Sequence, residues 1–84
     1  MNKLLLEVVC PATGKHYDFW IAKKLRISEV IVKLCYEISH KENNPTLFGD
    51  TDTIILLSTK TGALDLRFTL SAAGVCSGDT VILV

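Results

Sequence analysis

The side chains that could support catalysis are few in this sequence, which contains two histidines and three cysteines. A nucleophilic enzyme needs a serine or cysteine beside a positioned base. Cys10 and His16 come nearest to that arrangement, because both flank the 11–15 connection between two predicted strands. An ordinary cross-strand contact explains this pair better, and His40 has no nucleophile beside it in the predicted helix. We therefore expect no catalytic residue and no enzyme activity.

Metal and cofactor sites are not expected either. Cys10, Cys35 and Cys76 are odd in number, far apart and without C-x-x-C spacing, which argues against a disulfide framework or a zinc site and fits a reducing cytoplasm. Cys76 lies in a predicted turn, where its thiol would be accessible. Asp50 and Asp52 alone make a poor metal site, and no glycine-rich loop opens a helix to bind phosphate.

Length and composition indicate one domain, spanning residues 1–84, with one compact core. Apolar residues make up 49% of the chain, and nine basic residues balance nine acidic ones. This balance predicts no long-range attraction to nucleic acid or to an anionic membrane. The apolar run before Glu7 is only three leucines, too short for a signal sequence or a membrane span. We expect a cytoplasmic protein that does not insert into membranes and recognises other proteins.

Two alternating segments, Lys3–Cys10 and Lys15–Ala22, predict an antiparallel hairpin with a turn over residues 11–14. Side chains of a strand alternate between its two faces, and Glu7 resists burial, so the alternate set should face the core. The expected inward residues are Leu4, Leu6 and Val8 from the first strand and Tyr17, Phe19 and Ile21 from the second.

A helix is predicted with Ser28 as its N-cap, because Ile27 and Val32 then occupy the positions of a hydrophobic staple. The Asn43-Asn44-Pro45 run should end it, since the residue before proline avoids the α region. One face carries an apolar stripe at helical spacing, which should pack on the sheet. The stripe consists of Ile27, Val30, Ile31, Leu34 and Ile38, with Cys35 at its edge.

The rest of the chain predicts a loop, three short strands and one tight helical turn. The loop, 46–53, should tuck Leu47 and Phe48 inward. The third strand, 54–57, has four consecutive apolar residues, so which side faces the core stays open. The remaining elements are a strand over 63–67, a helical turn over 70–75 closed by Gly74, and a strand over 80–84 with Val81 and Leu83 in the core.

This order of elements predicts an α+β fold in which a mixed five-stranded sheet grips one helix, the β-grasp. The run from Thr69 to Val81, TLSAAGVCSGDTV, resembles the Thr-Leu-Ser-x-x-x-Ile run that precedes the last strand of ubiquitin-like proteins. The Tyr17-Asp18-Phe19 strand, together with the Leu-Ser-x-x-Gly-Val and Gly-Asp motifs of this run, resembles the sequences of the YukD and EsaB ubiquitin-like proteins. These proteins belong to type VII secretion in Gram-positive bacteria.

The resemblance implies a small cytoplasmic accessory of the bacterial secretion apparatus, related to the ubiquitin-like cytoplasmic domain on a membrane component of similar systems. It would be a non-enzymatic interaction module. Ubiquitin and the sulfur carriers end in a mobile Gly-Gly, whereas this sequence ends in Ile82-Leu83-Val84. Conjugation and sulfur transfer are therefore not expected.

The outer face of the sheet is the expected binding surface. Contiguous apolar patches in solvent usually mark contacts with other chains, and ubiquitin-like domains commonly bind through this face. This apolar patch would not exist if a loop covers these residues or if their strands face the other way. The candidate residues are Leu5, Val9, Trp20, Ile82 and Val84, with either Ile54 and Leu56 or Ile55 and Leu57.

Two other functions stay open: a structural homo-oligomer, such as a homodimer, formed through the apolar outer sheet face, and a protein modifier or sulfur-carrier-like protein. Smaller features have ordinary explanations. Val32 and Tyr36 are four apart on the exposed side of the helix, as single exposed apolar residues often are. Lys23, Lys24 and Arg26 could meet an acidic partner or phosphate, although a solvated connector explains them better.

Overall fold

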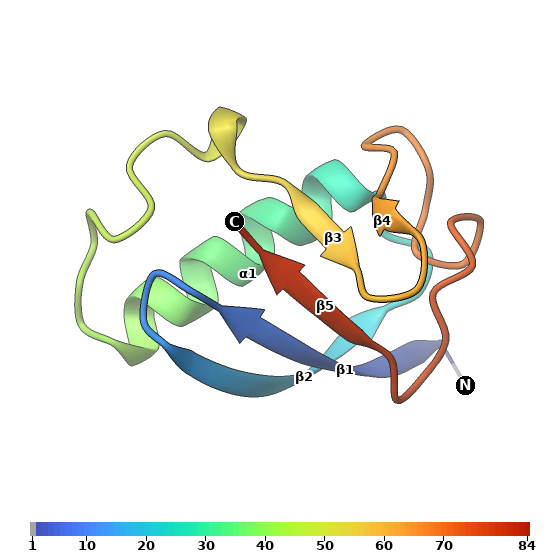
Figure 1. The fold of residues 1–84 in the computed structure, drawn as a ribbon, viewed down its shortest axis with the longest axis horizontal. Helices are drawn as coiled ribbons and strands as arrows, with labels where there is room; N and C mark the ends of the chain where they lie inside the picture. Colours follow the sequence, from blue (N-terminus) through green and yellow to red (C-terminus); the bar gives the residue numbers. More distant parts are fainter. Residues whose placement is uncertain (1) are drawn as a thin grey trace.

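In the computed structural model, which describes residues 2–84, a mixed five-stranded sheet curls around one α-helix (Figure 1). The strand order is β2-β1-β5-β3-β4, so the first and last strands lie side by side in the centre. This is the β-grasp arrangement, which confirms the predicted fold class. The elements are β1 (Lys3–Cys10), β2 (Lys15–Ala22), α1 (Ile27–Lys41), the 3-10 helix η1 (Thr51–Thr53), β3 (Leu56–Ser58), β4 (Gly62–Ala63) and β5 (Thr80–Leu83).

The β1–β2 hairpin forms with the predicted bounds and faces. Its two strands pair antiparallel over all eight residues, from Lys3 opposite Ala22 to Cys10 opposite Lys15. Gly14 closes the turn at φ 69°, in the left-handed region that favours glycine, and its N–H donates to the Cys10 carbonyl at 2.9 Å. The residues expected inward are buried or packed against the core: Leu6, Val8, Ile21, Leu4, Tyr17 and Phe19.

The first and last strands of the chain pair with each other in the middle of the sheet. β1 pairs with β5 in parallel, with Val8 opposite Val81, and β3 pairs with β5 antiparallel, with Leu56 opposite Leu83. All four side chains are buried, so Val81 and Leu83 are core residues as predicted. The pairing also settles the open face of the 54–57 segment: Leu56 and Ile54 face the core, and Ile55 and Leu57 face outward.

The start of α1 differs from the prediction, because Ser28 lies inside the first turn and Arg26 is the N-cap residue. The first helical N–H groups have no partner within a helix and need acceptors from elsewhere. Here the Ile27 N–H donates to the Phe68 carbonyl at 2.8 Å, and the Ser28 N–H donates to the Leu66 carbonyl at 3.2 Å. Backbone carbonyls of a distant loop thus replace the side-chain cap that the sequence favoured.

The end of α1 and its buried stripe agree with the prediction. Asn43 adopts φ 52°, its N–H donates to the His40 carbonyl at 3.1 Å, and the Asn44 N–H donates to the Ser39 carbonyl at 2.9 Å. This is a Schellman motif with asparagine at the left-handed position. The buried helix residues are the predicted stripe, namely Ile27, Val30, Ile31, Leu34, Cys35 and Ile38.

Three short elements differ from the prediction, whereas the turn over 70–75 agrees with it. The third strand is Leu56–Ser58 rather than 54–57. The fourth strand is Gly62–Ala63 rather than 63–67, because the Asp65 carboxylate accepts the Arg67 N–H at 2.9 Å and turns the chain there. The 70–75 segment forms hydrogen-bonded turns, with the Val75 N–H donating to the Leu70 carbonyl at 3.1 Å, and ends at Gly74 with φ 80°. The short helix η1 lies in the 46–53 segment, which was predicted as a loop.

Core packing predicts the cost of truncating the helix stripe. Leu34 is 0% exposed between helix and sheet, whereas Val32 on the same helix is 55% exposed. Leu34→Ala should lower the free energy of unfolding by about 2–5 kcal/mol, because it leaves a cavity. Val32→Ala is the control and should change it by less than about 0.5 kcal/mol. Urea unfolding followed by circular dichroism measures both, and equal losses would contradict the assigned helix face.

Candidate protein-interaction surface

The structure separates the two residues that came nearest to a catalytic pair. Cys10 is fully buried on the core side of β1, whereas His16 lies opposite Val9 on the outer face. The His16 ring instead places Nδ1 3.3 Å from Glu7 Oε2. The expected approach of Cys10 and His16 across the hairpin is therefore wrong, because adjacent strand positions point to opposite faces.

The three thiols differ in environment. Cys10 and Cys35 are buried and Cys76 is exposed. Burial raises the pKa of the Cys35 thiol to about 11, which keeps it protonated at neutral pH. Within residues 2–84, no group of three or more His, Cys, Asp or Glu side chains could hold a metal ion. In the same residues, no helix combines the length and apolar character that a membrane crossing needs.

Strand register assembles an apolar row across the outer face. Val9 of β1 lies opposite Ile82 of β5, and Ile82 lies opposite Leu57 of β3. Beyond this row, Ile55 and Val84 exchange two backbone hydrogen bonds of 2.7 and 3.0 Å. Both are exposed, at 45% and 41%. We call the five residues Val9, Ile55, Leu57, Ile82 and Val84 the outer strip.

A cross-strand row of Asp18, Glu7 and Thr80, which we call the polar band, borders the outer strip. Glu7 lies opposite both Asp18 of β2 and Thr80 of β5. The Thr80 hydroxyl donates to Glu7 Oε1 at 2.8 Å, and this bond, more than the His16 contact, holds the pKa of Glu7 below its ordinary value. The band therefore carries a fixed negative charge at neutral pH, which separates the apolar residues on its two sides.

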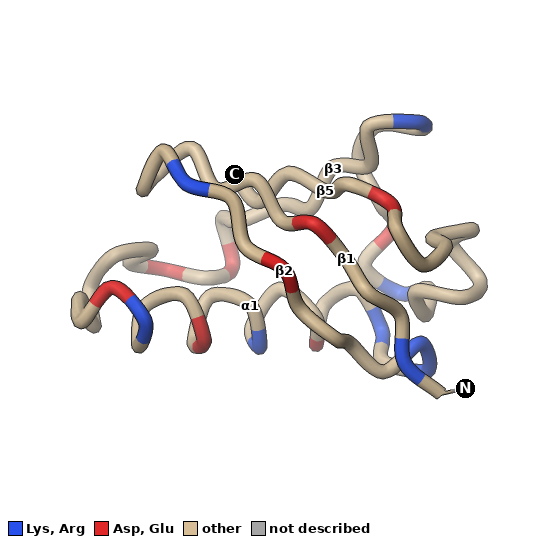
Figure 2. Tube along the Cα trace, turned by 90° about the horizontal axis from the view of Figure 1, so that it is seen from below, with Lys and Arg blue, Asp and Glu red and all other residues tan. Residues whose placement is uncertain are grey.

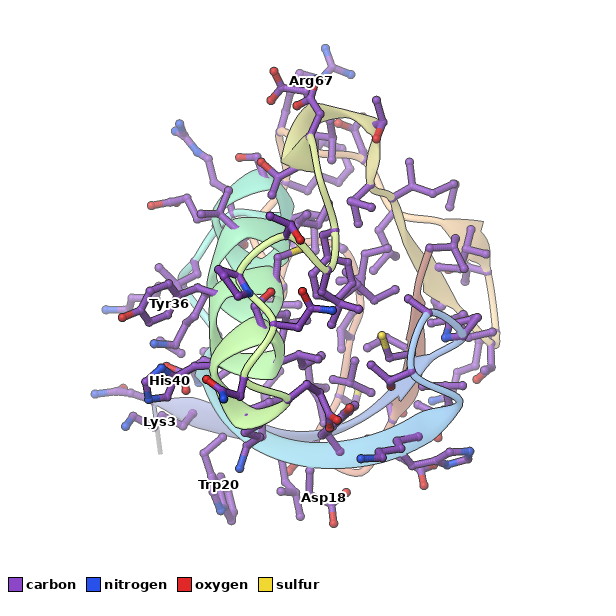
Figure 3. All side chains as sticks on the ribbon, turned by 90° about the vertical axis from the view of Figure 1, so that its left-hand side faces the viewer. Lys3, Asp18, Trp20, Tyr36, His40 and Arg67 are labelled. Atoms are coloured by element: carbon purple, nitrogen blue, oxygen red, sulfur yellow. The ribbon has the colours of Figure 1, made fainter. Side chains whose placement is uncertain are left out.

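The polar band divides the patch that the sequence predicted. Leu5 and Trp20 are direct cross-strand partners, and Trp20 is 53% exposed. Figure 3 shows Trp20 pointing away from the helix on the same side of β2 as Asp18. Leu5 and Val9 are four positions apart along β1, a distance of about 13 Å at the usual strand rise. The structure thus brings together Val9, Ile82 and Val84 and leaves Leu5 and Trp20 as a separate pair.

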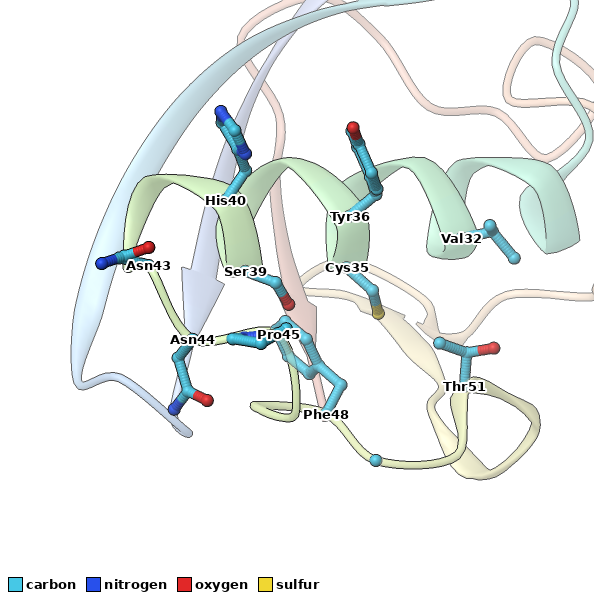
Figure 4. A pocket seen from close by; sticks show the side chains of 11 residues that line it. Val32, Cys35, Tyr36, Ser39, His40, Asn43, Asn44, Pro45, Phe48 and Thr51 are labelled. Carbon is cyan, nitrogen blue, oxygen red and sulfur yellow. The ribbon is translucent and has the colours of Figure 1, made fainter.

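A groove of about 460 Å³ runs between α1 and the loop that follows it (Figure 4). Cys35 and Ser39 point from the helix toward Pro45 and Phe48. Tyr36 and His40 also line the groove, although their rings point away from Pro45 and Phe48. The Tyr36 and His40 rings are stacked, with centroids 6.3 Å apart. Sequence reasoning expected Phe48 to tuck inward but missed the groove, because the separation of loop and helix has no signal in local periodicity.

Comparisons with known proteins identify the fold. No family model and no curated protein matches the sequence. The EccD5 ubiquitin-like domain from Mycobacterium xenopi superposes with a TM-score of 0.78 at 12% identity, covering 100% of this chain and 94% of that one. Ubiquitin from Caldiarchaeum subterraneum gives 0.73 at 23% identity, covering 96% and 90% of the two chains. The UBL domain of Plasmodium falciparum Dsk2 gives 0.69 at 18%, covering 96% and 95%. The chain has a ubiquitin-like fold.

The polar band predicts a measurable pKa. Thr80→Val removes the hydroxyl donor and keeps the side-chain shape, so the pKa of Glu7 should rise toward 4.5. A lowered folded-state pKa stabilises the protein above the unfolded value, and this contribution is lost as pH falls through the folded value. The stability difference between wild type and Thr80→Val should therefore shrink in acid. Carboxyl-carbon NMR titration measures the pKa of Glu7, and Thr53→Val is the control. An unchanged Glu7 pKa in Thr80→Val would contradict the assigned hydrogen bond.

Thiol accessibility predicts selective labelling. In the native protein one thiol, Cys76, should react rapidly with an aromatic disulfide reagent, while Cys10 and Cys35 react only after unfolding. The Cys76→Ser variant should lose the fast phase entirely. Fast reaction of a second thiol in the folded protein would contradict the buried positions.

Proposed function

We propose that this chain is a non-enzymatic protein-interaction module, a single ubiquitin-like domain that docks through its outer strip. The observation that carries the proposal is the apolar row formed by Val9, Ile82 and Leu57 on three neighbouring strands, which is half-buried and continues into the exposed Ile55 and Val84. A ubiquitin-like domain is a general interaction module, and a paired sheet holds these side chains in fixed positions. Little conformational freedom is then lost on binding.

The surroundings of the strip have the anatomy of a protein interface. Such interfaces combine an apolar centre with a polar, solvated rim. On this sheet Glu7, Thr80 and His16 form a hydrogen-bonded margin along one side of the strip. The most exposed strip residues, Ile55 and Val84, lie on the other side. A partner could therefore bury the aliphatic side chains while the charged margin stays hydrated. The margin would also limit the orientations in which the partner docks.

For the biological setting, we propose a cytoplasmic accessory or regulatory role in a bacterial type VII secretion system. The proposal draws on the resemblance of the Tyr17-Asp18-Phe19 strand and the 69–81 run to the YukD and EsaB proteins. It draws also on the superposition of the fold on the EccD5 ubiquitin-like domain over 100% of this chain, at 12% identity. The proposed partner is a protein component of the secretion apparatus.

Charge placed in the outer strip tests the proposal. Ile55→Asp and Val84→Asp put a carboxylate where a partner would exclude water, and should reduce capture of the secretion membrane complex at least about tenfold. Val32→Asp is the control, because Val32 is a valine on the helix that is somewhat more exposed than Ile55 and Val84. Affinity capture from native cells measures binding, and circular dichroism shows that each variant is folded.

The same variants distinguish a homodimer. If the outer strip pairs two copies of this chain, sedimentation equilibrium of the wild type should show concentration-dependent mass, and Val84→Asp should abolish it. Two results together would reject the outer strip as a binding surface. The wild type would be a monomer, and the Ile55→Asp and Val84→Asp variants would capture the secretion complex as well as the wild type does.

A further inference from the structure

The end of the molecule that carries the N-terminus is built from segments far apart in sequence. The chain entering α1 pairs with the 66–71 loop: the Leu70 N–H donates to the Leu25 carbonyl at 3.0 Å, and the Ser71 N–H donates to the Lys23 carbonyl at 3.1 Å. The Lys23 N–H in turn donates to the Asn2 carbonyl at 2.9 Å. These bonds hold three separate segments together at one end of the fold.

Charge is concentrated at this end. The 2–4, 23–29 and 65–71 segments hold five cationic residues, Lys3, Lys23, Lys24, Arg26 and Arg67, and two acidic ones, Glu29 and Asp65. The chain has nine of each sign, so the remainder holds four cations and seven acids. Figure 2 shows basic positions gathered near the N-terminus. A net charge of zero therefore hides an uneven distribution of charge along the molecule.

Most of these cations are free to act. Arg67 is paired with Asp65 at 2.8 Å. Within residues 2–84, Lys3, Lys23, Lys24 and Arg26 take part in none of the ion pairs. Lys3, Lys24 and Arg26 are exposed and Lys23 is half-exposed. An anionic surface could therefore be neutralised by four side chains without breaking any internal pair.

Two large apolar side chains accompany the free cations. Leu66 and Phe68 are 46% and 47% exposed, although their backbone carbonyls are fixed by the first N–H groups of α1. Side chains held this way project from a rigid turn. Exposed Leu and Phe beside Lys and Arg is the combination by which peripheral proteins contact the headgroup region of a bilayer.

We propose that this end, which we call the basic end (Lys3, Lys23, Lys24, Arg26, Leu66 and Phe68), is a peripheral contact site for an anionic lipid surface. The geometry favours a lipid surface over an acidic peptide. A peptide normally occupies a groove or a sheet edge. The groove described above instead lies beside the C-terminal half of α1, whereas the basic end consists of turns and connectors together with Lys3, the first residue of β1. This contact does not depend on the proposed function, because the outer strip uses other residues.

Vesicle sedimentation with the full chain tests the proposal. The wild type should bind phosphatidylcholine vesicles that contain about 30% phosphatidylserine and should not bind pure phosphatidylcholine vesicles. Raising the salt concentration from about 0.02 M to about 0.5 M should release it, because the attraction is screened.

Two variants test the two components of the contact. Each basic residue at such a surface strengthens binding about fivefold, so the double variant Lys24→Glu, Arg26→Glu should weaken it at least about 25-fold. Lys33→Glu, Lys41→Glu is the matched control, because both lysines are exposed on α1 beyond the basic end. Phe68→Ser should weaken binding several-fold, whereas Tyr36→Ser, at a more exposed aromatic residue on the helix, should not.

Three outcomes would overturn the proposal. The first is no binding to phosphatidylserine vesicles at low salt. The second is an equal loss in the basic-end and control variants. The third is binding to soluble poly-L-glutamate that is tighter than vesicle binding and insensitive to Phe68→Ser, which would assign the basic end to an acidic protein segment instead.

Discussion

The parallel pairing of β1 with β5 is the interaction on which the rest of the structure depends. It joins residues 7–9 to residues 80–82, so the chain must close almost its entire length before the pairing forms. Val8 and Val81 then complete the core beneath the sheet. Above it, the same register sets Val9 beside Ile82 and Glu7 beside Thr80. One pairing thus determines the core, the outer strip and the polar band.

A second long-range contact links the helix to the surface chemistry. The 66–68 loop supplies carbonyl acceptors for the first turn of α1, which satisfies N–H groups that a side-chain cap would otherwise serve. The backbone of this loop caps the helix, and its Leu66 and Phe68 side chains are exposed. The same contact carries the loop to the Lys23–Arg26 connector. Helix capping and the composition of the basic end therefore have one structural cause.

The two proposed contact surfaces are chemically distinct and use different parts of the fold. The outer strip is aliphatic, lies on paired strands and has a charged margin, which suits a shaped protein partner. The basic end consists of connectors and a turn whose cations form no ion pair within residues 2–84, which suits a fluid anionic surface. A ubiquitin-like domain with both surfaces could rest on a membrane through one end while the sheet face stays open to a protein.

Sequence alone determined which side chains face the core wherever a local period was clear: the two hairpin strands, the helix stripe from Ile27 to Ile38, and the asparagine stop. The outward position of Val9, Ile82 and Trp20 followed from the same alternation. Tertiary structure decided the rest, because register and capping depend on residues far apart in the chain. The cap at Arg26, the inward face of Leu56 and the separation of Trp20 from the outer strip all come from such pairings, which no local pattern records.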